Sequence, residues 1–176
     1  THADFFAAHD TIRLHAISKD KAAFETVRNY VINNFGATTS INSLTKALEK
    51  SGLRITRATV AKYITALVDA KILYECNRFD MKSKKALAGE KKYYLADLSF
   101  YFAGNTDNRI NFGPVLENIV YVYSRSLDYL VSVGRIGKLE CDFILRNNEN
   151  EYSYVQVAYT IMQSKETENR EYRPLE

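Results

Sequence analysis

Residues 54–72 constrain the fold more than any other stretch, because their apolar residues recur at the spacing of a single helix face. Val60, Ile64 and Leu67 form that face. Thr56 precedes it, and its hydroxyl can accept a hydrogen bond from the first turn of a helix. The residues on the opposite side are small or polar, so we expect a helix with one buried and one exposed face.

Two runs of strand-favouring residues follow this helix, at residues 72–79 and 92–95. The loop between them, residues 80–90, contains three lysines. A helix, a strand, a basic loop and a second strand occur in this order in a winged helix-turn-helix. In that fold the helix enters a DNA groove and the loop contacts phosphates.

Two further helices are predicted before this unit. Residues 20–35 place apolar side chains on one face before Gly36, and Ser40 can cap a second helix that ends at Gly52. Three helices, with a glycine-containing turn between the last two, form the core of a helix-turn-helix domain. We therefore assign residues 20–97 to a winged helix domain.

The second half of the chain has a different pattern. We expect residues 98–113 to be a linker, because a short apolar turn there is followed by a polar loop. Pro114 can occupy the first position of a helix. The predicted buried face of this helix comprises Leu116, Ile119, Val120, Tyr123 and Leu127. Three strands are predicted after it, the last two as an antiparallel hairpin, at residues 129–133, 138–146 and 152–159.

The charge of the chain changes sign between the two halves. Residues 1–95 contain 16 Lys and Arg against 9 Asp and Glu, and residues 96–176 contain 8 against 12, so +7 and −4 give the overall +3. A basic first half favours a polyanionic partner such as double-stranded DNA. The side chains expected to contact it are Arg57, Thr59 and Lys62 on the helix and Lys82, Lys84 and Lys85 in the wing.

Other features of the composition restrict the cellular setting. No apolar run approaches the roughly 18 residues that a membrane-spanning helix needs. Cys76 and Cys141 lie far apart and belong to no metal or disulfide motif. We therefore expect a cytoplasmic protein with two reduced thiols and no membrane partner.

Acidic side chains of the second half follow the order found in metal-dependent nucleases. Glu117 lies on the predicted helix, and Asp142 lies on a predicted strand with Glu140 on the same face. Two such carboxylates can hold Mg²⁺, and a lysine on the next strand would stabilise charge near the attacked phosphate. This layout resembles the core of the restriction-endonuclease-like superfamily.

The third predicted strand departs from that layout. Gln156 stands where the second carboxylate belongs, and Ala158 stands where the lysine belongs. Lys138, on the same strand face as Asp142, could supply the missing ammonium group. We nevertheless expect no catalytic residue and no metal ligand, and we expect Glu140 and Asp142 to be polar residues of an edge or solvent-facing strand.

Three parts of the chain carry motifs in an order and spacing known from one group of proteins. They are Asp10-Thr-Ile-Arg-Leu-His15 before a helix ending in Asn33-Asn-Phe-Gly36; Lys92-Tyr-Tyr-Leu-Ala-Asp97; and Leu116-Glu-Asn-Ile-Val-Tyr121 with Glu140-Cys-Asp-Phe-Ile144 and Val155-Gln-Val-Ala-Tyr159. From about residue 10 onward, the chain resembles the C-terminal region of a group of prokaryotic AAA-type ATPases. Those proteins join a P-loop ATPase to a winged helix and a degenerate nuclease-like domain of unknown function.

The resemblance implies an α+β organisation in four segments. Residues 1–19 would link the winged helix (20–97) to an ATPase domain that precedes them, and residues 98–113 would link it to a truncated nuclease-like domain (114–176). ATP and Mg²⁺ are expected at the ATPase domain and no cofactor here, because this segment contains no P-loop motif. The family layout has a further helix and strand, so we expect an open sheet edge that could pair with a second copy.

The sequence therefore leads to one principal hypothesis and two alternatives. The principal one is a non-catalytic, DNA-binding C-terminal region of an AAA-type ATPase, with its own ATPase domain as a partner. The first alternative is a Mg²⁺-dependent nuclease that uses Glu117, Asp142 and Lys138. The second is a protein-interaction module whose surface includes tyrosines of the second half, although we expect these mainly to pack in the core. These tyrosines are Tyr121, Tyr123, Tyr129, Tyr152, Tyr154 and Tyr159.

Overall fold

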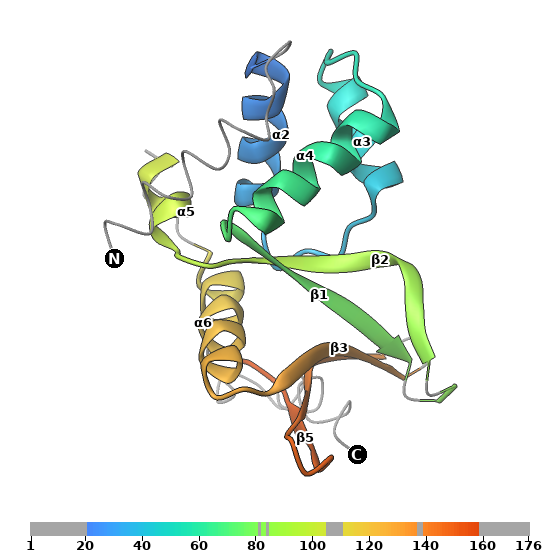
Figure 1. Cartoon of the computed structure of the whole chain (residues 1–176), viewed down its shortest axis with the longest axis vertical. Helices are drawn as coiled ribbons and strands as arrows, with labels where there is room; N and C mark the ends of the chain where they lie inside the picture. Colours follow the sequence, from blue (N-terminus) through green and yellow to red (C-terminus); the bar gives the residue numbers. More distant parts are fainter. Residues whose placement is uncertain (1–20, 81, 84, 105–110, 137–138, 159–176) are drawn as a thin grey trace, which may run out of the picture.

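The chain folds into a mixed α+β structure around one five-stranded sheet (Figure 1). A computed structural model describes residues 21–80, 82–83, 85–104, 111–136 and 139–158, without the side chains of residues 85–88, 136 and 139. The order of the strands is β2-β1-β3-β4-β5. Strands from both halves of the sequence therefore belong to the same sheet.

Three helices of the first half pack together on one side of the strands β1 and β2 (Figure 1). Ser40 and Thr56 cap the second and third of them, as predicted, by accepting hydrogen bonds from the N–H groups of Ser43 and Thr59. An edge-to-face contact between Phe24 and Tyr63 joins the first helix to the third. The three helices are α2 (Lys21–Asn33), α3 (Ile41–Lys50) and α4 (Arg57–Asp69).

The strands β1 (Leu73–Asp80) and β2 (Lys85–Leu95) form an antiparallel hairpin. The predicted loop of residues 80–90 is wrong in its extent, because β2 begins at Lys85 and the turn is correspondingly short. Asn77 pairs with Lys91 whereas Arg78 pairs with Leu87, so residues 88–90 form a bulge in β2. Such a bulge redirects the side chains beside it.

Alternate residues of β2 pack into two different cores. Tyr93 and Leu95 pack against α2, α3 and α4, whereas Tyr94 packs with residues of the second half. This alternation follows from the two-residue period of a strand, which sends successive side chains to opposite faces. Lys92 lies two residues before Tyr94 and therefore faces the second half as well.

The second half extends the sheet with three strands, β3 (Leu130–Ile136), β4 (Leu139–Arg146) and β5 (Tyr152–Val155). β3 pairs in parallel with β1, and β4 pairs antiparallel with both β3 and β5. The predicted hairpin of the last two strands is confirmed. The first of these three strands was predicted to end at residue 133, before Gly134. This is wrong, because β3 continues through Gly134 to Ile136.

A bulge in β4 brings the side chains of residues 140 and 143 to the same face of the sheet. Gly134 pairs with Cys141 and Ser132 pairs with Ile144, so one residue of β3 lies opposite two residues of β4. A Cβ atom on Gly134 would lie within 3.1 Å of Cys141 and Ile144, which therefore share the face on that side. The extra residue lets positions 140 and 143, which would otherwise alternate, both face the remaining helix.

That remaining helix is α6 (Phe112–Ser126), which follows the short helix α5 (Ser99–Gly104). Asn111 caps α6 by accepting a hydrogen bond from the N–H group of Gly113. Pro114 was predicted to be the first residue of this helix, but it is the third. Within the described residues, no helix combines the length and apolar character that a membrane span requires.

The predicted buried face of α6 is wrong for three of its five residues, although Val120 does pack against the core. Ile119, Tyr123 and Leu127 are each about half exposed or more, at 49%, 64% and 52% of their surface. The helix is rotated relative to the predicted orientation because Asn118 and Tyr121, two side chains that carry polar groups, are buried in the contact with the sheet. Asn118 is 1% exposed and Tyr121 is 2% exposed. Both make specific contacts with β2, which a count of apolar residues cannot reveal.

Asn118 completes the hydrogen bonding of an edge strand. Its Oδ1 accepts from the N–H group of Leu95 at 2.7 Å, and its Nδ2 donates to the carbonyl of Leu95 at 3.0 Å. The side-chain amide thus takes the place of a neighbouring strand for this residue of β2. The pair of bonds fixes the position of α6 along the sheet.

Replacing Asn118 by alanine should lower the free energy of unfolding by about 2–4 kcal/mol, because it leaves the two backbone groups of Leu95 buried without partners. Urea unfolding followed by circular dichroism measures this change. Asn29→Ala in the exposed face of α2 is the matched control and should change stability by no more than about 0.5 kcal/mol. Equal effects of the two substitutions would contradict the role of Asn118.

Candidate functional site

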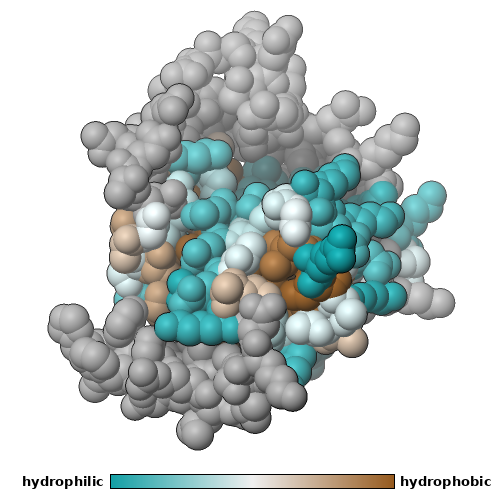
Figure 2. Space-filling model, turned by 90° about the horizontal axis from the view of Figure 1, so that it is seen from above, coloured by the Kyte–Doolittle hydropathy of each residue, from teal (hydrophilic) through white to brown (hydrophobic). Residues whose placement is uncertain are grey.

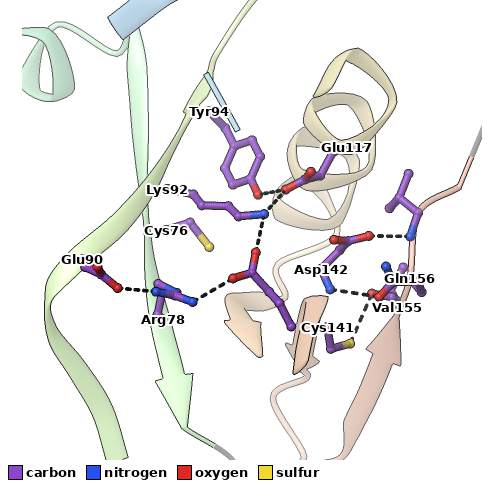
Figure 3. Close-up of polar contacts among 12 residues, drawn as sticks. Cys76, Arg78, Glu90, Lys92, Tyr94, Glu117, Cys141, Asp142, Val155 and Gln156 are labelled. Atoms are coloured by element: carbon purple, nitrogen blue, oxygen red, sulfur yellow. Dashed lines mark hydrogen bonds and ion pairs between the residues drawn. The ribbon is translucent and has the colours of Figure 1, made fainter. Parts of the chain in front are cut away.

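A buried cluster of ion pairs lies where the two halves of the chain meet, with Lys92 of β2 at its centre. Lys92 is 5% exposed. Its Nζ donates to Oε1 of Glu117 at 2.8 Å and to Oε1 of Glu140 at 2.9 Å (Figure 3). Glu117 comes from the second turn of α6 and Glu140 from the start of β4. One ammonium group therefore joins three elements that are far apart in the sequence.

Arg78 of β1 extends the cluster. Its Nη2 donates to Oε2 of Glu140 at 2.7 Å, and its Nη1 donates to Oε2 of Glu90 at 2.5 Å. Glu90 lies in the bulge of β2, which brings its side chain to Arg78. Both oxygens of Glu140 thus bind a cation. The Nε of Arg78 is buried and has no hydrogen-bond partner among the described residues.

Tyr94 holds the carboxylate of Glu117 from a second direction. Its hydroxyl donates to the same Oε1 that accepts from Lys92. The ring of Tyr94 stacks on that of Tyr121 with the centroids 4.3 Å apart, which fixes its orientation. Burial, and then the neighbouring charge of Glu117, raise the pKa of Tyr94 far above its usual value. Tyr94 is therefore a neutral hydrogen-bond donor at any physiological pH.

The ammonium of Lys92 stays charged in spite of its burial. Burial lowers its pKa, but the charges and hydrogen bonds of Glu117 and Glu140 outweigh this effect, so the pKa lies above its ordinary value of 10.5. A raised pKa stabilises the fold fully below the unfolded value and ceases to do so only as the pH rises through the folded value. The ion pairs are therefore intact throughout the neutral range.

Asp142 and Gln156 form a separate contact between β4 and the residues after β5. Oδ2 of Asp142 accepts from the N–H group of Val157 at 2.8 Å, and the N–H group of Asp142 donates to Oε1 of Gln156 at 3.3 Å (Figure 3). Ala158 is half-buried. Lys138, expected to supply an ammonium group, lies outside the described residues.

The expectation that Glu140 and Asp142 are polar residues of an edge or solvent-facing strand is wrong. β4 lies between β3 and β5, so it is not an edge strand. Both oxygens of Glu140 and one oxygen of Asp142 are engaged by protein groups. The bulge in β4 and the cations of β1 and β2 account for this, and neither is visible in the pattern of the strand itself.

The arrangement places a cation or a hydrogen-bond donor of the protein on each of these carboxylates. Glu117 and Glu140, which could otherwise share a cation, share the ammonium of Lys92. Within the described ranges, no group of three or more His, Cys, Asp and Glu side chains is placed to hold a metal ion. The ammonium group beside these carboxylates comes from β2.

The two thiols are free, as the sequence indicated. Burial raises the pKa of Cys76 to about 12, and it also raises the pKa of Cys141. Sγ of Cys141 donates to the carbonyl groups of Phe143 and Val155. Both thiols are therefore protonated at neutral pH and take a structural part in the sheet.

The residues expected to contact DNA belong to two places, α4 and the turn between β1 and β2. Arg57 and Lys62 are exposed on α4, but Thr59 is half-buried and its hydroxyl bonds that of Thr56 at 2.9 Å. Lys82 is exposed at the hairpin turn, whereas Lys84 and the side chain of Lys85 lie outside the description. The view onto the helical end of the molecule shows mainly hydrophilic atoms around a smaller apolar area (Figure 2).

Reasoning from the sequence missed Lys92, Arg78, Glu90 and Tyr94 as members of a site. A signal was present: Lys92 opens a run of residues, 92–95, that are otherwise apolar or aromatic. Lysine is almost never fully buried without an ionic partner. A lysine in such a run therefore indicates a carboxylate elsewhere, although the sequence does not say which one.

These observations define a mixed α+β protein whose two halves are joined by buried ion pairs. The chain belongs to the family described as Domain of unknown function (DUF8612), which matches residues 8–109. The match includes Arg78, Glu90 and Lys92 but ends before Glu117 and Glu140.

Two curated relatives extend the similarity across most of the chain. One is an uncharacterized protein of Haemophilus influenzae, 28% identical over 152 residues, which are 86% of this chain and 38% of the relative. The other is an uncharacterized protein of Methanocaldococcus jannaschii, 26% identical over 168 residues, which are 93% of this chain and 36% of the relative. The chain thus spans little more than a third of their length. No solved structure matches the chain significantly.

Replacing Glu117 by alanine should lower the free energy of unfolding by about 3 kcal/mol, because Lys92 loses one carboxylate and the hydroxyl of Tyr94 loses its acceptor. Thermal or urea unfolding measures the loss. Glu75→Ala is the control: Glu75 pairs with Lys91 on the same hairpin, but both side chains are 33% exposed. Its removal should cost at most about 1 kcal/mol, and a comparable loss for both variants would refute a special role for Glu117.

Proposed function

We propose that this segment is a non-catalytic, DNA-binding region of a larger ATPase, built from a winged helix and a nuclease-like unit without a working site. The observation that carries the proposal is the pair of exposed cations on α4, beside a β-hairpin. Arg57 is exposed in the first turn of α4 and Lys62 on its outer side, whereas Val60, Ile64 and Leu67 are buried. A helix of this kind can lie in the major groove with its polar face toward the bases.

The elements around α4 support the winged helix. The helices α2, α3 and α4 precede the hairpin in the order that this fold requires. Thr39, between α2 and α3, pairs with Lys91 through two backbone hydrogen bonds of 2.8 Å. This bridge joins the segment between α2 and α3 to β2 at a single residue pair. In Figure 1 the N-terminal end of α4 and the turn between β1 and β2 lie toward the same side, away from α6.

The charge distribution supports nucleic acid as the partner. Residues 1–95 carry a net charge of +7, whereas the rest of the chain carries −4. Phosphate contacts by lysine and arginine supply most of the sequence-independent affinity for DNA. The lysines at the hairpin turn, residues 82, 84 and 85, would act in this way.

The contacts of the second half support a nuclease-like unit that does not cleave. A helical glutamate, Glu117, and a strand acid, Glu140, both bond the ammonium group of Lys92, much as acids and a lysine gather in the nuclease layout. However, each carboxylate is engaged by a protein donor, and Gln156 replaces an acid that would bind Mg²⁺. The alternative, a Mg²⁺-dependent nuclease, would have to release Lys92 from both glutamates first.

The proposal of a parent ATPase is supported by the family resemblance and by the length of the relatives. Each relative is more than twice as long as the part that this chain matches, which leaves room for a P-loop domain. Such a protein would work in the cytoplasm, with ATP and Mg²⁺ at the ATPase domain and this segment as its DNA-contacting region.

A second candidate function is protein binding, favoured by one specific observation. Ile119, Tyr123 and Leu127 form an exposed apolar line along α6, and Tyr152 and Tyr154 of β5 are also about half exposed. Exposed apolar residues that gather on one surface often form protein interfaces. Duplex DNA binding that is unaffected by changes in α4 and the hairpin would favour this second function.

The double variant Arg57→Ala with Lys62→Ala should bind a random-sequence DNA duplex at least about tenfold more weakly, since each lost cationic contact removes a substantial part of the affinity. Fluorescence anisotropy measures this at a fixed salt concentration. The charge-matched control is Lys71→Ala with Arg125→Ala, two exposed cations at the opposite end of α4 and on α6. Equal weakening by both pairs would mean that only net charge matters.

The triple variant of Lys82, Lys84 and Lys85 to alanine tests the hairpin turn. If these lysines contact phosphates, the slope of log affinity against log salt should become shallower by about 2–3, since each contact contributes roughly 0.9. Binding should weaken similarly for all sequences. An unchanged slope would rule out the turn as a phosphate-binding wing.

A further inference from the structure

The position of the Lys92 ammonium group is the position that a bound cation would take. It lies 2.8 Å from an oxygen of Glu117 and 2.9 Å from an oxygen of Glu140, so one ammonium group bonds both carboxylates. A divalent cation binds carboxylate oxygens at about 2.0–2.6 Å. Only a small approach of the two side chains would be needed, and Glu140, at 33% exposure, has room to move.

The charges of the cluster agree with this reading. Glu90, Glu117 and Glu140 carry three negative charges, and Arg78 and Lys92 carry two positive charges, so the net charge is −1. Without Lys92 the net charge would be −2, which one divalent cation would balance.

The lysine also comes from an unexpected place. It comes from β2 of the first half and sits between the carboxylates. An ammonium group and a divalent cation cannot both be bound between these two carboxylates, because two positive charges so close together would repel each other.

We propose that Lys92 is a built-in replacement for a divalent metal ion, so that the carboxylates of Glu117 and Glu140 form a cation site that the protein keeps closed with its own side chain. The proposal deepens the proposed function, because it gives the reason for the non-catalytic second half. Removal of the ammonium group should open the site to a hard divalent or trivalent cation such as Mn²⁺, Ca²⁺ or Tb³⁺.

The test compares Lys92→Met with wild type, using Tb³⁺ and Mn²⁺ as probes. The hydroxyl of Tyr94 bonds Glu117, so a Tb³⁺ ion at this site would be excited through a tyrosine in direct contact with its ligand. We expect tyrosine-sensitised luminescence to rise about tenfold in Lys92→Met over wild type. Saturating Mn²⁺ should raise the melting temperature of the variant by about 5 °C and leave that of wild type unchanged.

Two controls localise the effect. Lys91→Met removes a neighbouring lysine that faces the other side of the sheet and pairs with Glu75 of β1, and it should bind no more Tb³⁺ than wild type. Lys92→Met combined with Glu117→Gln should lose the luminescence again, because a neutral amide is a poor ligand. Lys92→Gln, which keeps a hydrogen-bond donor near the glutamates, serves if Lys92→Met does not fold.

Three outcomes would overturn the proposal. One is a folded Lys92→Met or Lys92→Gln variant that binds neither ion. The second is luminescence that persists in the variant with Glu117→Gln. The third is Glu117-dependent binding of Mn²⁺ by wild type, which would mean that Lys92 does not close the site. DNA binding by α4 is measured separately, so its failure would be distinguishable from any of these.

Discussion

The structure depends above all on the ion pairs that Lys92 makes with Glu117 and Glu140. A buried ammonium group is stable only beside carboxylates, and a buried carboxylate only beside cations or donors. Lys92 belongs to β2, whereas its partners belong to α6 and β4. Their desolvation is offset only when all three elements are docked. The ion pairs therefore specify how the second half of the chain meets the first, more than they add to its stability.

The sheet makes this docking consequential for function. β2 serves both cores, with Tyr93 packed against the three helices and Tyr94 stacked on Tyr121 of α6. The hairpin that would contact DNA therefore continues into the strand that carries Lys92. A displacement of the hairpin turn would be transmitted to the ion pairs, because closely packed protein interiors transmit strain. Under the proposed function, the second half would support the DNA-binding first half and would not act as a second active centre.

Local features of the fold could be predicted because local sequence decides them. The caps Ser40 and Thr56 satisfy N–H groups within the next three residues, and the hairpin of β4 and β5 follows from the turn between them. The buried face of α6 could not be predicted, since the apolar side chains Ile119 and Tyr123 suggested the wrong one. Asn118 decides it by bonding the backbone of Leu95, a partner outside the helix.

The sequence by itself determined which stretches form the principal helices and strands, that Ser40 and Thr56 cap α3 and α4, and that basic residues gather in the first half and acidic residues in the second. Only the tertiary structure decided that Lys92 fills the space between Glu117 and Glu140, that a bulge turns Glu140 toward it, and that all five strands form one sheet. The reason is physical: hydrogen bonds within a turn involve neighbours in the chain, whereas a buried charge is stabilised by whichever opposite charge the fold brings near.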